Sequence, residues 1–149
     1  MDDLTRDERK LEEGKLIANG IEALWDDLQS ATKRAVTAHN ELHRGDAYHW
    51  EAQTVVNNSD TAIIVSYRYR AFALAIVDAT LKLSLDRKQA VLCITGNPDG
   101  RQTRAIGQFR TRADLTAKTL HFADSKGDLF SAVQVADFAV AERFFDKRA

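Results

Sequence analysis

Apolar residues recur every three or four positions through the first third of the chain. The members of this stripe are Ile17, Ile21, Leu24, Leu28, Ala31, Ala35, Ala38 and Leu42. Their period is that of one face of an α-helix. Thr5 followed by Glu8 is the pattern of a capping box, and Gly45 stands where a C-terminal glycine would close the helix. The pattern therefore predicts one long helix over residues 5–44.

This stripe has two interpretations. Spacings that alternate strictly between four and three residues are also typical of a coiled coil. However, Ala18 and Trp25 stand where a two-stranded coiled coil prefers Glu or Lys. They widen the apolar stripe, which favours packing on the chain's own sheet. However, residues 16–44 as a helix would extend ~43 Å, whereas a compact domain of this length is about 38 Å across. We therefore expect either a break at Gly14 or Gly20, or a projecting apolar end that a second copy covers. The residues predicted for that self-association are Ile17, Ile21, Leu24 and Trp25.

After residue 45 the pattern changes to the two-residue alternation of β-strands. Strands are predicted over residues 48–56, 63–69, 72–85, 90–95 and 102–112, with a short addition over 118–122. The stretch 72–85 is also compatible with a helix, and we favour a strand. Asn97-Pro98-Asp99-Gly100 has the composition of a type I turn, so residues 90–112 are predicted to form a hairpin.

A second helical pattern closes the chain. Ser125 to Asp128 could cap a helix that runs to about Phe145. Its predicted stripe is Leu129, Val133, Ala136, Val140 and Phe144. The predicted fold class is α+β, in a single domain over residues 1–149. It has a long N-terminal helix (5–44), an antiparallel β-meander of about five strands (46–122) and a C-terminal helix (126–146) packed on the curved sheet.

Composition narrows the class of protein. The chain has 149 residues, 44% of them hydrophobic and 29% charged, with a net charge of −1. This is ordinary globular composition, which excludes wholesale disorder and collagen-like architecture. One cysteine permits no internal disulfide and suits a reducing compartment. The acidic start does not resemble a signal peptide, and no apolar run approaches the ~20 residues that cross a bilayer. We expect a cytoplasmic protein.

Four residues have metal-ligating side chains close together in sequence. His39 and His43 lie one helical turn apart, and Asp46 and His49 follow. Such groups can bind Zn²⁺ or Ni²⁺. The helix is predicted to end near Gly45, so His49 need not return to the same point. We interpret these histidines as surface and helix-end residues and expect no metal.

Catalytic signals are weak. Cys93 lies between apolar residues, which predicts a buried, inert side chain. No phosphate-binding loop, dinucleotide fingerprint or Gly-x-Ser-x-Gly motif is present, so no cofactor is expected. Glu51, Asp78 or His49 could act as a general acid or base if they faced a cavity inside the sheet. We favour a protein that is not an enzyme.

Charge is segregated along the chain. Residues 1–59 hold 12 acids and 7 bases, whereas residues 60–120 hold 5 acids and 10 bases. Several arginines share one parity of their strands, opposite the aromatic residues, which predicts a basic outer face on the sheet. The residues of this face are Arg68, Arg70, Arg104, Arg110 and Arg112.

The function that these observations favour is a small non-catalytic protein-binding, adaptor or regulatory protein. It would form a homodimer through the N-terminal helix, with the basic face available to an acidic protein partner. One alternative is a small-molecule-binding or enzymatic protein with a cavity between the curved sheet and the C-terminal helix. Another is nucleic-acid binding through the arginines. The aromatic residues on the opposite side and a pI of about 6.4 disfavour it.

Overall fold

The computed structural model describes residues 5–44, 52–56, 62–70, 76–97 and 101–140. Within these residues the chain forms a long helix, seven strands and a short helix. The elements are α1 (Arg6–Leu42), β1 (Gln53–Val56), β2 (Ala62–Arg70), β3 (Ile76–Asp86), β4 (Val91–Asn97), β5 (Arg104–Asp114), β6 (Thr119–Ala123), β7 (Leu129–Phe130) and α2 (Ala132–Asp137). The strands lie in chain order in one curled antiparallel sheet. This confirms the α+β class and the meander, with seven strands rather than about five.

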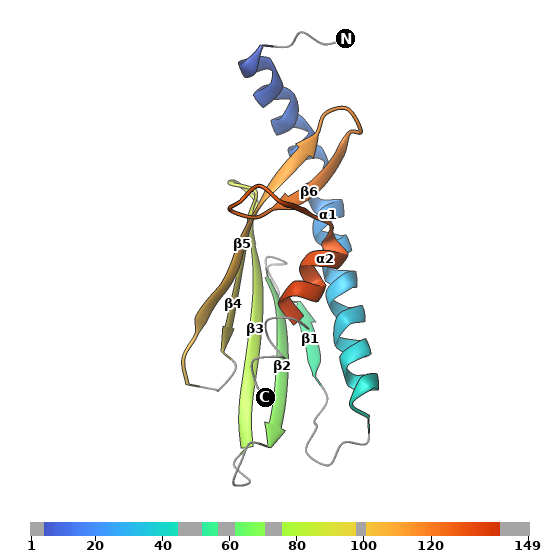
Figure 1. Ribbon diagram of the computed structural model, residues 1–149, viewed down its shortest axis with the longest axis vertical. Helices are drawn as coiled ribbons and strands as arrows, with labels where there is room; N and C mark the ends of the chain where they lie inside the picture. The colour runs from blue at the N-terminus through green and yellow to red at the C-terminus, as the bar shows by residue number, and fades with distance from the viewer. Residues whose placement is uncertain (1–4, 45–51, 57–61, 71–75, 98–100, 141–149) are drawn as a thin grey trace.

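Helix α1 is continuous over 37 residues. Thr5 caps it, since the Thr5 Oγ1 accepts a hydrogen bond from the Glu8 N–H at 3.1 Å. Neither Gly14 nor Gly20 interrupts the helix, so it extends ~55 Å. Figure 1 shows it running beside the sheet, with its N-terminal end projecting beyond the strands. The helix does project, but not with the predicted apolar end, because Ile21 is buried and Ile17 packs against the core.

The core lies between the sheet and the two helices. α1 contacts α2, β1, β5 and β6, and α2 lies between α1 and the strands (Figure 1). Leu28 of α1, Leu81 of β3 and Ile94 of β4 are all fully buried. The predicted helical stripe leaves the core at its C-terminal end, where Leu42 is 79% exposed.

The C-terminal helix differs from the prediction. Leu129 and Phe130 pair with β6 as strand β7, so the helix begins later, after the cap Ser131. Ser131 and Gln134 form its capping box. The buried face also differs from the predicted stripe, because Leu129 and Val133 are exposed. The residues that face the core are Ala132, Val135, Ala136, Ala139 and Val140.

Candidate functional site

The polar side chains of β5 lie on the outer face of the sheet, away from the helices. Gln108, Arg110 and Arg112 are exposed, whereas Phe109 and Thr111 between them are buried. Successive residues of a strand point to opposite faces, which explains this alternation. Arg110 and Arg112 therefore share the outer face.

Arg104 does not share it, because the pairing of β4 and β5 shifts register between Ile94 and Thr95. Ile94 lies opposite Gly107, whereas Thr95 lies opposite Ala105, so Ile106 is an extra residue on β5. A β-bulge of this kind reverses the alternation on its far side. Arg104, opposite Gly96, is exposed but belongs to the other face of the sheet. The predicted single row of arginines on β5 is thus divided.

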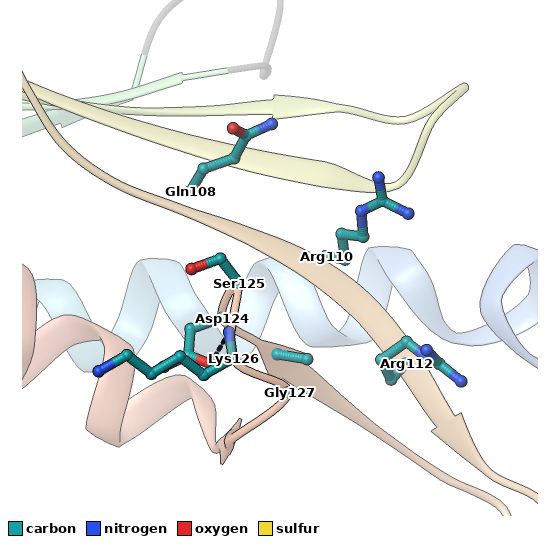
Figure 2. Close-up of a pocket in the computed structure, with 8 residues that line it drawn as sticks. Gln108, Arg110, Arg112, Asp124, Ser125, Lys126 and Gly127 are labelled. Carbon is teal, nitrogen blue, oxygen red and sulfur yellow. Dashed lines mark hydrogen bonds between the residues drawn. The ribbon is translucent and has the colours of Figure 1, made fainter.

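A groove of about 550 Å³ lies beside the outer face of β5. We call it the basic groove. Its lining is Gln108, Arg110 and Arg112 from β5, Ala123 from β6, and the turn of residues 124–127 that follows β6. Figure 2 shows the three β5 side chains spaced along the strand, with that turn running beside it. The lining brings together three cationic side chains, those of Arg110, Arg112 and Lys126, and one carboxylate, that of Asp124.

One of these cations already holds a carboxylate of the same chain. Arg112 Nε donates to Glu13 Oε2 at 2.9 Å, and the Ala113 N–H donates to the same oxygen at 3.0 Å. The register of β4 explains why that N–H is available. Strand β4 begins at Val91, opposite Arg110, so β5 extends past the end of its neighbour. Glu13 of α1 supplies the acceptor that β4 no longer provides, and Arg112 neutralises its charge.

The other two cations have no such partner. Within the described part of the chain, neither Arg110 nor Lys126 makes a side-chain hydrogen bond or an ion pair. Several backbone N–H groups of the turn donate hydrogen bonds within it. Asp124 Oδ1 accepts from the N–H groups of Lys126 and Asp128, at 2.9 and 3.0 Å, and the Gly127 N–H donates to the Asp124 carbonyl. These three amides are therefore not available to an anion in the basic groove.

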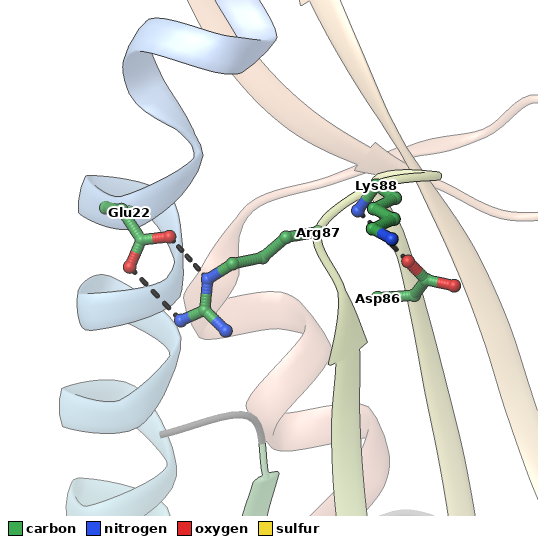
Figure 3. Close-up of polar contacts among 4 residues, drawn as sticks. All are labelled: Glu22, Asp86, Arg87 and Lys88. Atoms are coloured by element: carbon green, nitrogen blue, oxygen red, sulfur yellow. Dashed lines mark hydrogen bonds and ion pairs between the residues drawn. The ribbon is translucent and has the colours of Figure 1, made fainter. Parts of the chain in front are cut away.

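Two other arginines of the described structure form ion pairs with acids of this chain. On the outer face, Arg68 donates to Asp78 across β2 and β3 at 2.6 Å, and this hydrogen bond raises the pKa of the Arg68 guanidinium. Arg87 makes a two-bonded ion pair with Glu22 of α1 (Figure 3). Arg70 ends β2 opposite Ile76, and its side chain lies outside the described residues. Arg110, in contrast, makes no ion pair within the described part of the chain.

The four residues predicted for self-association lie at the core of this chain. Ile21, Leu24 and Trp25 are 6%, 8% and 1% exposed, and Ile17 packs against them. The chain's own sheet and α2 cover these side chains, which is the packing that the wide stripe favoured. Three of the four residues predicted for self-association are therefore buried within this chain.

The histidine and carboxylate candidates that the structure describes, His39, His43 and Asp78, do not come together in one site. His39 and His43 do share one side of α1, with ring centroids 4.6 Å apart, and Tyr67 lies edge-on to His39. Within the described ranges, no group of three or more His, Cys, Asp or Glu side chains could hold a metal ion. Asp78 is exposed and paired with Arg68, so it does not face a cavity inside the sheet. Asp46, His49 and Glu51 lie outside the described residues.

The prediction of a buried Cys93 is wrong. The thiol is exposed on the outer face of β4, opposite Gln108. Leu92 and Ile94 occupy the core side of the strand, so alternation turns the residue between them outward. Its apolar neighbours in sequence are therefore not its neighbours in space.

One residue of the basic groove was missed by the sequence analysis. Lys126 was assigned to the start of the C-terminal helix, but it lies in the turn between β6 and β7. Two signals could have identified this turn. Asp124 has the side chain that commonly caps such turns, and Gly127 adopts a φ of +89°, which favours glycine.

No protein-family model, curated protein or solved structure matches this chain. No helix among the described residues has both the length and the apolar character needed to span a bilayer. Fold and groove together describe an α+β protein with a basic groove on the outer face of a curled sheet.

Proposed function

We propose that this protein is a non-catalytic binding protein whose basic groove takes an acidic segment of a partner protein. The observation that carries the proposal is which of the three cations in the groove have an anionic partner. Arg112 already holds a glutamate carboxylate, while Arg110 and Lys126 beside it have no anionic partner within the described structure. The groove therefore has cationic groups available, and one of its arginines shows the carboxylate chemistry expected of the ligand.

Two features favour an acidic protein over a nucleic acid. The lining of the groove contains no aromatic side chain on which a base could stack. The phenylalanine contacts of β5 are made on the core side, where Phe109 meets Phe122, Phe130 and Phe138 edge-on. The chain also has a net charge of −1, whereas nucleic-acid-binding domains are commonly basic overall.

The cytoplasm remains our expectation for this activity, since a lone exposed thiol suits a reducing compartment.

The test uses a fluorescein-labelled oligoglutamate peptide and fluorescence anisotropy. We expect binding that weakens as salt is raised, because the contacts are ionic. Arg110→Ala and Lys126→Ala should each weaken binding about two- to fivefold, the effect of losing one partly exposed ion pair. Arg104→Ala is the matched control, since Arg104 is an exposed arginine on the same strand but on the other face. It should leave the affinity unchanged.

Two results would contradict the proposal. If Arg104→Ala weakens binding as much as Arg110→Ala, the protein attracts acids by overall charge rather than in the groove. If a single-stranded oligonucleotide of equal charge displaces the peptide efficiently and itself depends on Arg110, the nucleic-acid alternative is preferred.

A further inference from the structure

A second hollow of about 350 Å³ adjoins the basic groove. The two share Arg112, Ala123 and Gly127, so they are neighbouring parts of one depression on the outer face. The lining of the second hollow differs, because it adds Leu129, His121 and Asp114. We call this second part the apolar end of the groove, after Leu129.

Leu129 is an unusual residue to find on this surface. It is 57% exposed, although it belongs to a paired strand. Ala123 lies between it and Arg110, since Arg110 pairs with Ala123 and Ala123 pairs with Leu129. The groove thus combines an exposed leucine with Arg110 and Lys126, which make no ion pair among the described residues, and Asp114 lines its apolar end. Charge and hydropathy therefore change along the depression.

We infer that the acidic partner segment carries an apolar side chain that rests on Leu129. This inference rests on the proposed function, and it adds the order of chemical groups in the ligand. Acidic side chains would face Arg110 and Lys126. Asp114 would repel acids from the apolar end, so a ligand that is acidic throughout fits only part of the groove.

The sheet geometry sets the spacing of those groups. Leu129 lies two strands across from Arg110, which is about 10 Å at the usual separation of strands. An extended peptide covers that distance in about three residues. Side chains of an extended segment point to the same side only at even spacings, so the ligand is an extended segment with a leucine or similar residue two or four positions from an acidic residue, about 7 or 13 Å away.

The experiment compares two labelled peptides with the full chain. Both have glutamates at the second and fourth positions before and after one central residue, which is Leu in one peptide and Ser in the other. We expect the Leu peptide to bind about three- to tenfold more tightly, as partial burial of one leucine side chain implies. Leu129→Ser should remove this advantage and leave the affinity for the Ser peptide unchanged. Val133→Ser is the matched control, because Val133 is 50% exposed and lines neither part of the groove. It should preserve the advantage.

The outcomes separate this inference from the proposed function. If both peptides bind equally and binding still depends on Arg110, the apolar end has no role and the inference is refuted while the basic groove stands. If Leu129→Ser and Val133→Ser reduce the Leu advantage equally, the leucine binds elsewhere and the inference is also refuted. If neither peptide binds, both proposals fail.

Discussion

The two glycines of α1 offer a matched test of how the helix packs. At Gly14 an added Cβ would meet no atom within 4 Å, so Gly14→Ala changes only helix propensity. Alanine is better than glycine in a helix interior by about 1 kcal/mol. At Gly20 the added Cβ would lie 2.9 Å from Leu120 Cδ1 and 3.4 Å from its Cγ. Moving a side chain off its rotamer costs about 0.5–1.5 kcal/mol, which offsets most or all of the gain.

We therefore expect Gly14→Ala to raise the free energy of unfolding by about 1 kcal/mol and Gly20→Ala to change it by less than about 0.5 kcal/mol. The gain at Gly14 should appear in global unfolding, because the neighbouring Glu13 is bonded to Arg112 and Ala113 of the sheet. For a chain of this size, 1 kcal/mol corresponds to a rise in Tm of about 2–4 °C.

Urea denaturation followed by circular dichroism measures both variants against the parent chain. If Gly14→Ala leaves the midpoint unchanged, the N-terminal turns of α1 unfold independently of the sheet. If Gly20→Ala stabilises as much as Gly14→Ala, Leu120 does not rest on Gly20 in solution. Either result would refute the packing described for this end of the helix.

Three further predictions test other parts of the structure. Arg87 lowers the pKa of the Glu22 carboxyl below its usual 4.5, so the pair stabilises the folded chain above that pH and the benefit is lost as pH falls through the lowered pKa. The free energy of unfolding of Glu22→Gln, measured in urea, should be lower than the parent's at neutral pH by less than about 1 kcal/mol, because Glu22 is 60% exposed, and the two should converge in acid. Cys93 should react with a thiol reagent in the folded protein, and a thiol that reacts only after denaturation would contradict its exposure. Leu24→Ala should cost about 2–5 kcal/mol of stability in urea, whereas Leu42→Ala should cost less than about 0.5 kcal/mol. A small cost at Leu24, which is 8% exposed, would instead support its predicted role in self-association.

Elements specified by local pattern were predictable from the sequence. The cap at Thr5 and the apolar period of α1 depend only on residues near one another in the chain, and both appear in the structure. The antiparallel order of the strands followed from short turns between alternating runs, since such connections join neighbouring strands.

The start of the C-terminal helix was not predictable in this way. Leu129 and Phe130 fit a helical stripe as well as a strand, and their pairing with β6 decides between the two. That pairing depends on tertiary structure. The exposure of Cys93 also depends on tertiary structure. Leu92 faces the core, so its neighbour Cys93 faces outward.

The arginines show why parity alone does not define a binding surface. Strand alternation predicts one basic face, but a single extra residue on β5 moves Arg104 to the other side. Asp78 then neutralises Arg68, and Glu13 engages Arg112 from a position 99 residues away in sequence. Neither acid could be assigned to its arginine from the spacing of residues, because both contacts require the folded sheet. Of the two arginines in the basic groove, Arg110 is the one for which the described residues supply no ion-pair partner, and the proposed ligand site therefore centres on it.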